Sequence, residues 1–457
     1  MTSHDPAPTE NPSRLARLSA GIRAALDDSV LRALVASSSV SRIGRGVFFA
    51  ITVLYFTQIL GLTGTEAALV LAMASGTGVL ASLLGGWLAD RWSARRMTFA
   101  FEALGGALLV AYAFAGDFIS ALIIACTSNF FDTLGHSSRS AIIARGFTAD
   151  KRVFTRAVLR TVTNVAIAVG AGIAATALAI GTGASYRAVI IVAGVLGVVG
   201  SLPLLGLPAR VDAAPRATTT SIRTETGSID TVAQGEAERA SRREWNRRSP
   251  WRDPRYLLLA LLSAVFGMQF GVAEVGVPLW VTSATEAPEV IVAVLLIVNT
   301  TLVVIFQVPL SRGTHDVRTA GRVTMIAGWL MAAACIVYAL SAGHPTWVAI
   351  VLLIIAALTH TFAEVLSQAG AWGLSFELAD PQRAGAYQGV FGMGFSLSAL
   401  AAPLVVNATA IQMGMVGWII LAVVFLGAAV GIAVIAKRAA AAIEREAASH
   451  NPSAAAV

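Results

Sequence analysis

The chain alternates long apolar segments with short polar ones. An apolar helix of about 18 residues or more can cross the roughly 30 Å hydrocarbon core of a bilayer. We expect twelve such spans, at 33–60, 67–89, 97–114, 119–142, 154–182, 188–207, 256–282, 290–310, 322–341, 347–374, 387–409 and 416–437. The pattern therefore predicts an all-α integral membrane protein with twelve transmembrane helices.

A short charged segment follows the second span and recurs, in degenerate form, in the second half. Asp90, Ala94, Arg96 and Thr98 reappear 226 positions later, at the same spacing, as Asp316, Ala320, Arg322 and Thr324. Internal repeats of this kind are typical of secondary transporters. We therefore expect two pseudo-symmetric six-helix bundles, 33–207 and 256–437, around a central cavity.

Three polar segments flank the two bundles. We expect 1–32 to be a cytoplasmic N-terminal segment, in which 12–27 forms either an amphipathic surface helix or a mobile tail. The segment 208–255 is rich in Ala, Thr, Ser, Arg and Glu, so we interpret it as a cytoplasmic linker with one short helix at 235–248. The segment 438–457 is expected to be a cytoplasmic tail.

Composition supports the membrane assignment and gives an orientation. Hydrophobic residues make up 56% of the 457 positions and charged residues 13%, which excludes an ordinary soluble domain. Arginine and lysine gather at the termini and in the loops after even-numbered spans, so both termini are predicted to be cytoplasmic, in a bacterial cytoplasmic membrane. This asymmetry explains the net charge of +7 and suggests no nucleic-acid partner.

The sequence gives no indication of a cofactor, a metal site or a catalytic site. Cys126 and Cys335 lie within apolar spans, where thiols pack as small hydrophobic groups. A Walker A loop needs a lysine after a glycine-rich segment, and neither Lys151 nor Lys437 follows one. We therefore expect a monomer that is not an enzyme, with a small-molecule substrate, protons and the lipid bilayer as its partners.

The charged segment also carries a family resemblance. Gly86, Leu88, Ala89, Asp90, Arg91 and Arg95 match the hinge pattern Gly-x-Leu-Ala-Asp-Arg-x-Gly-Arg-Arg, although Ser93 and Ala94 depart from it. With its twelve spans and two halves, the chain resembles the major facilitator superfamily. The resemblance implies that Asp90 meets the N-terminal end of the eleventh helix in the outward-facing state, where the helix dipole favours a carboxylate. The expected cytoplasmic gate comprises Gly86, Asp90, Arg91, Arg95, Asp316 and Arg322.

Ionisable residues within the spans are candidates for proton coupling, because burying a charge in hydrocarbon is costly. Asp132 lies in the fourth span, and His360 and Glu364 lie at similar depth in its repeat partner, the tenth. His360 and Glu364 are one helical turn apart, so they can share or relay a proton. The structural alternative is a hydrogen-bonded pair that fixes helix packing.

The seventh span contains the candidate substrate carboxylate. Glu274 lies between Gln269 and Pro278, which suggests a kinked helix that lines the outer part of a cavity and attracts cations. The alternative is a water-exposed residue at a flared helix end. Apolar side chains expected to complete the cavity are Met268, Phe131 and Trp372.

The remaining charges within or beside the spans are expected near the cytoplasmic boundary. Arg45, and with it Arg42, is expected to extend its guanidinium to that boundary, and Glu102 to pair with a hinge arginine there. Candidate partners in the intracellular gate are Arg139, Arg145, Arg160 and Asn164.

These features predict a proton-coupled secondary active transporter that works by alternating access. It resembles the multidrug efflux branch of the superfamily and is expected to export amphiphilic or drug-like compounds. Two motifs of drug/proton antiporters are absent: Phe131 stands where their fourth helix has an arginine, and no proline follows Gly170 in the fifth span. The alternative is a proton symporter that imports a sugar, a peptide or an organic acid. Two other classes of protein fit the sequence less well. A transporter-like receptor or inactive scaffold would lack carboxylates such as Asp132 and Glu364 at mid-depth, and a channel would need a filter motif that the sequence does not contain.

Overall fold

The computed structural model describes residues 28–212 and 249–450. In these residues every regular element is helical, and twelve helices are long and apolar enough to cross a membrane. The predicted all-α membrane fold is confirmed. The helices expected at 12–27 and 235–248 lie outside the described residues.

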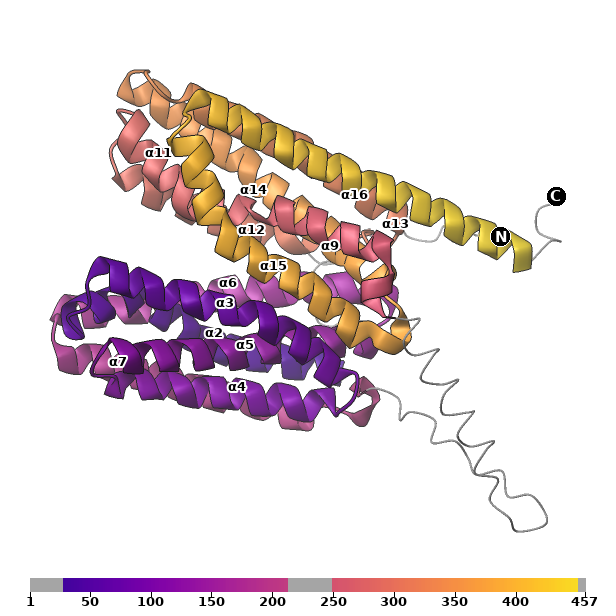
Figure 1. Cartoon of the computed structure of the whole chain (residues 1–457), viewed down its shortest axis with the longest axis horizontal. Helices are drawn as coiled ribbons and strands as arrows, with labels where there is room; N and C mark the ends of the chain where they lie inside the picture. The colour runs from indigo at the N-terminus through magenta and orange to yellow at the C-terminus, as the bar shows by residue number, and fades with distance from the viewer. Residues whose placement is uncertain (1–27, 213–248, 451–457) are drawn as a thin grey trace, which may run out of the picture.

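The first half contains six long helices and several short helical turns (Figure 1). The long helices are α2 (Ser29–Leu54), α3 (Gly64–Ala89), α4 (Ala94–Ala111), α5 (Phe118–Gly146), α6 (Ala149–Ile180) and α7 (Gly183–Ser201). The short turns are η1 (Tyr55–Ile59), η2 (Tyr112–Phe114), η3 (Leu202–Gly206) and η4 (Ala209–Val211).

The second half repeats this plan with more interruptions. Its helices are α9 (Pro254–Gly267), α10 (Gln269–Gly271), α11 (Val277–Ala284), α12 (Val290–Leu310), α13 (Val317–Leu340), α14 (Thr346–Glu377), α15 (Ala384–Val406) and α16 (Met415–His450). Its short turns are η5 (Pro250–Arg252), η6 (Val272–Gly276), η7 (Pro381–Arg383) and η8 (Asn407–Ile411). The Ala-, Arg- and Glu-rich sequence after 437 favours helix, and α16 continues to His450.

The seventh span is broken rather than continuous. The π-helical turn η6 separates α10 from α11, and Pro278 lies in the first turn of α11. A π-helical turn adds a residue to the helical repeat and changes which side chains face each neighbouring helix. Glu274 lies within this turn and is exposed.

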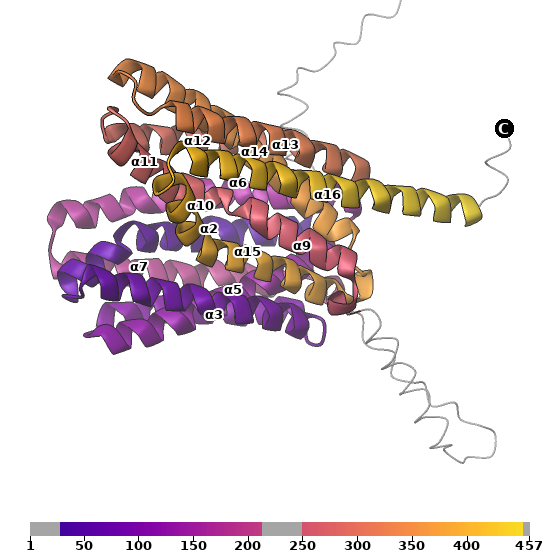
Figure 2. The same cartoon turned by 45° about the horizontal axis from the view of Figure 1, so that its top comes forward.

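The two halves meet at the end of the molecule where the linker leaves α7 and enters α9, which we call the linker end; the opposite end is the far end. Here α3 contacts α15, and both views show the halves converging at this end (Figures 1 and 2). A Cβ atom on Gly86 would lie 2.2 Å from the carbonyl oxygen of Gly385 and 2.8 Å from the Cα of Gly389. Glycine at position 86 therefore allows this close approach of the two helices.

Among the described residues, the buried apolar side chains form three clusters. One cluster joins both halves at the linker end and includes Leu31, Ile142, Tyr256, Trp372 and Phe391. The other two clusters belong to one half each, around Trp418 in the second half and Tyr55 in the first. Apolar burial thus joins the two halves near the linker end, whereas each half packs its own core elsewhere.

Candidate functional site

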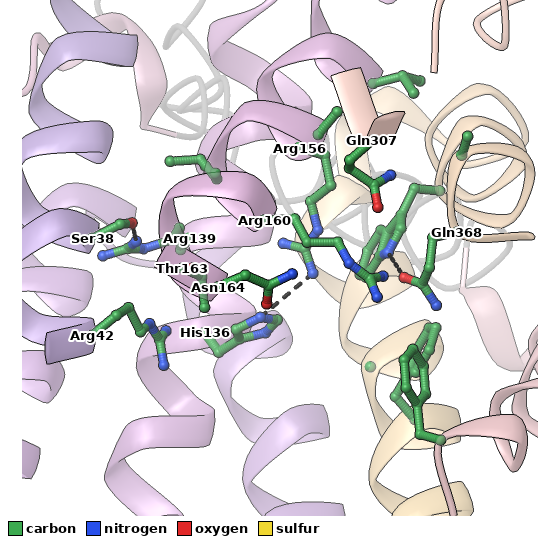
Figure 3. A pocket seen from close by; sticks show the side chains of 18 of the residues that line it. Ser38, Arg42, His136, Arg139, Arg156, Arg160, Thr163, Asn164, Gln307 and Gln368 are labelled. Carbon is green, nitrogen blue, oxygen red and sulfur yellow. Dashed lines mark hydrogen bonds between the residues drawn. The ribbon is translucent and has the colours of Figure 1, made fainter. Parts of the chain in front are cut away.

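A cavity of about 470 Å³ lies between the two halves. This volume is within the range of small-molecule sites in proteins. Its walls come from α2, α3, α5 and α6 of the first half and from α10, α12, α14 and α15 of the second. The polar and aromatic side chains that line it include Arg42, Asp132, His136, Arg139, Arg156, Arg160, Asn164, Phe270, Gln307, Gln368, Trp372 and Phe395 (Figure 3).

Positive charge dominates this lining. Four arginines line the cavity, and Asp132 is the one acidic residue among the described residues that do so. When the ion-pair partners just behind the wall are included, the group has five arginines and three carboxylates. This group of lining residues and ion-pair partners therefore carries two positive charges in excess, counting arginine and carboxylate groups as ionised.

Asp132 is held by two arginines of α2. Its carboxylate forms an ion pair with Arg45 and lies 3.9 Å from Nη1 of Arg42. The sequence placed Asp132 at mid-depth but expected both arginines to extend to the membrane boundary. They turn inward instead, because a carboxylate on the neighbouring helix compensates their charge.

Glu364 forms an ion pair across the two halves. Its buried carboxylate pairs with Arg160 of α6 and accepts a hydrogen bond of 2.9 Å from Nδ2 of Asn299 in α12. Removing one partner of such a pair leaves an uncompensated charge in a poorly hydrated place, which is strongly destabilising. Contact between the halves is thus linked to the charge state of Glu364.

Glu102 differs from its expected role. Rather than pairing with a hinge arginine at the boundary, it lies in the first half, 2.6 Å from Nη2 of Arg139, and accepts a hydrogen bond of 3.2 Å from Ser37. Both charged side chains are at least nine-tenths buried. This pair compensates the charge of Arg139 from behind the cavity wall.

Arg156 and His136 are cavity residues that the sequence analysis did not identify. The guanidinium of Arg156 lies 3.6 Å from the ring centroid of Trp372, across the two halves. It also donates hydrogen bonds of 3.4 Å to Ser140 and to Nε2 of His136. Among the described residues, Arg156 has no carboxylate within ion-pair distance. Its position near the predicted start of the fifth span made it resemble a boundary arginine.

The other predicted site residues are distributed over several places. Trp372 lines the cavity, whereas Gln269 is buried and donates to Ser367 at 2.9 Å. His360 is buried beside the ring of Tyr338 in the second half. Three residues expected in the cavity are absent from its lining: Glu274, which is exposed, Met268, which packs on the core of the second half, and Phe131, which packs against Phe101 and Phe130.

At the linker end, Asp90 caps a helix of the opposite half. Its carboxylate oxygens accept hydrogen bonds from the backbone N–H groups of Gly385, at 2.8 Å, and Ala386, at 2.7 Å, in the first turn of α15. It also forms an ion pair with Arg145 of α5. Burial raises the pKa of Asp90 above its ordinary value, while Arg145 and the two N–H groups act in the opposite direction.

Two neighbouring arginines contact residues of the first half. The guanidinium of Arg91 lies 3.7 Å from the ring centroid of Trp87. Arg95 forms an ion pair of 3.1 Å with Asp212, which also accepts hydrogen bonds from Ser93. These contacts attach the start of the linker to the hinge.

The repeat partners of these residues are placed differently. Asp316 caps its own helix, α13, by accepting a hydrogen bond of 2.7 Å from the N–H of Thr319. Hydrogen bonds with Thr319 lower the pKa of Asp316. Arg322 is exposed. Equal spacing in the sequence therefore does not give Asp90 and Asp316 equivalent contacts.

Comparison with solved structures identifies the same architecture in three transporters. The human organic anion transporter MFSD10 (TETRAN) is 12% identical, with a TM-score of 0.64 over 88% of this chain and 99% of that chain. The proton:xylose symporter XylE bound to 6-bromo-6-deoxy-D-glucose is 14% identical, with a TM-score of 0.61 over 90% and 95%. A bacterial homologue of the iron transporter ferroportin, in an outward-facing state, is 12% identical, with a TM-score of 0.64 over 90% and 98%.

At these identities the likeness shows the fold alone. No match was found among curated protein sequences. The sequence model of the Major Facilitator Superfamily matches residues 34–403, which include most of both halves. With twelve apolar helices, this match indicates a multi-pass membrane transporter rather than an enzyme. The chain belongs to the Major Facilitator Superfamily.

Proposed function

We propose that the protein is a proton-coupled secondary active transporter that carries amphiphilic organic anions by alternating access. The observation that supports this substrate class is the excess of arginine in the cavity, above all Arg156 without a carboxylate partner. An opposite charge is worth more in a poorly hydrated site than in water. Trp372, Phe270 and Phe395 offer apolar contact beside that charge.

This proposal changes the charge of the substrate expected from the sequence. The expectation of cationic substrates depended on Glu274, which does not line the cavity, although its charge interacts with that of Glu364. The fold accommodates anionic cargo, since human MFSD10 is described as an organic anion transporter. The excess of positive charge also favours the second candidate function, proton symport of an organic acid.

We assign the gate at the linker end to Gly86, Asp90, Arg91 and Arg95, with Arg145 as the partner of Asp90. The carboxylate of Asp90 stabilises the closed end by capping α15. Opening this end breaks both hydrogen bonds to α15. Asp316 has no such cross-half contact among the described residues, so its proposed role is to stabilise the start of α13 rather than to form part of the gate.

Proton coupling is proposed at Asp132 and Glu364. Each carboxylate is paired with arginine in the present state. A proton on either carboxylate removes its negative charge and leaves the paired guanidinium free to bind an anionic substrate. His360 fits this scheme less well, because it does not line the cavity.

The substrate proposal is tested in proteoliposomes with three compounds that share a naphthalene body: a sulfonate, an alcohol and an ammonium ion. We expect saturable transport of the sulfonate that a pH gradient drives to accumulation. Arg156→Gln should weaken sulfonate binding about 10- to 100-fold, since a hydrogen bond to a charged group contributes about 1.5–3 kcal/mol.

The control is Arg255→Gln, because Arg255 is exposed at the start of α9. This variant should transport the sulfonate as the unmodified protein does. Saturable transport of the ammonium ion without transport of the sulfonate would contradict the proposal. Equal effects of the two substitutions would remove Arg156 from the substrate site.

A further inference from the structure

The imidazole of His136 is a titratable group on the cavity wall that takes part in neither proposed carboxylate site. We propose that His136 takes up a proton when an anion binds at Arg156, so that the substrate anion and a proton occupy the cavity together. This inference rests on the proposed function and adds to it a third proton site, linked directly to substrate binding.

The contact between Arg156 and His136 defines the protonation state of the empty cavity. Nη2 of Arg156 lies 3.4 Å from Nε2 of His136 (Figure 3). A guanidinium can only donate hydrogen bonds, so Nε2 acts as the acceptor. In this state the ring is therefore neutral and carries its proton on Nδ1.

The charges around the ring come from three helices. Arg156 belongs to α6 and Arg42 to α2, while Asp132 and Arg139 belong to α5, as His136 does. Asp132 and Arg139 are already paired, with Arg45 and Glu102 respectively. The surroundings of the empty site therefore compensate an additional positive charge on the ring poorly.

A bound anion changes both the hydrogen bonding and the charge around the ring. When its negative group binds Arg156, the guanidinium N–H turns from Nε2 to the anion. The free lone pair of Nε2 then accepts one proton from the bulk solution, and the resulting imidazolium donates that N–H to the anion. The hydrogen bonds at 3.4 Å to His136 and Ser140 are long, so little hydrogen-bond energy is lost when the guanidinium N–H turns to the anion.

Uptake of one proton with each anion makes the two move in the same direction. The imidazolium and the anion carry opposite charges, so the pair adds no net charge to the cavity. A pH gradient then drives the anion towards the less acidic side. Within the two candidate functions, this linkage favours proton symport of an organic acid.

The test measures binding of naphthalenesulfonate to the purified full chain between about pH 5.5 and about pH 8.5, where a histidine changes charge and the sulfonate does not. In the unmodified protein, we expect the dissociation constant to fall as the pH falls, by up to about tenfold per pH unit for one linked proton. A pH indicator in weak buffer should record, per bound anion, up to one proton more in the unmodified protein than in His136→Gln.

Two substitutions at position 136 should change this dependence in different ways. His136→Gln should lose one linked proton and bind the sulfonate weakly at low pH, because its amide cannot become charged. His136→Lys should keep tight binding to a higher pH than the unmodified protein, because an amine holds its proton to a higher pH than an imidazole does. His344→Gln is the matched control, since His344 is an exposed histidine outside the spans. It should keep the full pH dependence.

The outcomes separate this inference from the proposed function. Sulfonate binding with the same pH dependence and the same proton uptake in His136→Gln as in the unmodified protein would overturn the role of His136 and leave the anion transporter in place. Sulfonate binding by the unmodified protein that is independent of pH, without proton uptake, would overturn the role of His136 together with the coupling proposed at Asp132 and Glu364, but not the preference for anions. Preference of the unmodified protein for the naphthalene ammonium ion at every pH would overturn the proposed function itself.

Discussion

The two repeat-related aspartates show how much a single residue's role depends on its neighbours. Asp90 accepts hydrogen bonds from α15 of the other half, whereas Asp316 accepts one from Thr319 of its own helix. Both follow an apolar helix and precede the same spacing of Ala, Arg and Thr. The sequence has a carboxylate at each turn, but it does not indicate whether the N–H groups that bind it belong to the same helix or to the opposite half.

Substitution of Asp316 should therefore affect stability rather than gating. Asp316→Ala removes an N-cap and should lower the free energy of unfolding by about 1 kcal/mol, while Asp316→Asn keeps a good cap. The effect is measured by thermal unfolding in detergent. If Asp316→Ala instead altered the balance between open and closed states at unchanged stability, Asp316 would belong to the gate.

The contribution of Asp316 to the free energy of unfolding should also depend on pH. Hydrogen bonds with Thr319 hold the pKa of Asp316 below its unfolded value, so the unfolded state binds the proton more readily. The stabilisation is fully present above the unfolded pKa, about pH 4. It is lost as the pH falls through the folded pKa, and this loss should be absent from Asp316→Ala.

Depth along a helix is predictable from the sequence, whereas rotation about its axis is much less so. Counting residues placed Asp132 at mid-depth, where it lines the cavity. The same counting placed Arg42 and Arg45 near the boundary, but the partner that draws them inward lies on another helix. Arg156 was missed for the same reason, because its cavity-facing direction follows from the packing of α6.

At the scale of elements, the hydrophobic segments predicted the twelve helices, since length and apolar content decide membrane crossing. The π-helical turn η6 is the feature that altered a site prediction. Glu274 lies inside this turn and is exposed, whereas Gln269, before the turn, is buried. A change of helical register of this kind arises from packing, and the Pro278 signal indicated a kink without giving its direction.

The contact between α3 and α15 gives a prediction with an internal control. Gly86→Ala places a methyl group against Gly385 and Gly389 and should force the two helices apart, which favours the state open at the linker end. Gly76→Ala lies in the same helix with open space around the new methyl group. It should be neutral or stabilising, because alanine favours helix over glycine by about 0.5–1 kcal/mol.

Crosslinking between the linker ends of α3 and α15 measures this effect. The crosslinked fraction should fall in Gly86→Ala and stay unchanged in Gly76→Ala. Unchanged crosslinking in both variants would mean that the two helices can adjust locally. The close approach would then have no part in setting the conformational balance.

At the scale of the whole molecule, the described state is held closed from one end. A hydrophobic cluster that includes both halves lies at the linker end, and the cross-half pairs of Asp90, Arg152 and Glu364 add polar contacts. The repeat in the sequence predicted two halves and a central cavity. Which end is closed depends on the sum of these contacts and cannot be deduced from either half alone.

The ion pair between Arg152 of α6 and Glu377 of α14 is one of these contacts between the halves. Changing its charge tests whether such contacts decide which end is closed. The two side chains lie 3.3 Å apart and are about one-fifth exposed, so the pair is worth about 0.2–1 kcal/mol. Glu377→Arg replaces attraction with repulsion and should move the balance towards opening at the linker end. A change of about 1 kcal/mol alters the ratio of the two states about fivefold.

Restoring the attraction should restore the balance. The double variant Arg152→Glu with Glu377→Arg rebuilds the pair in reverse, so spin-label distances between the linker ends of α6 and α14 should return towards those of the unmodified protein. Glu444→Arg is the matched control, since its partner Arg318 lies in the same half. If Glu444→Arg widened the same distances as Glu377→Arg, a general effect of added positive charge would explain the result. If only Glu377→Arg does so and the double variant reverses it, the contacts between the halves set the equilibrium on which alternating access depends.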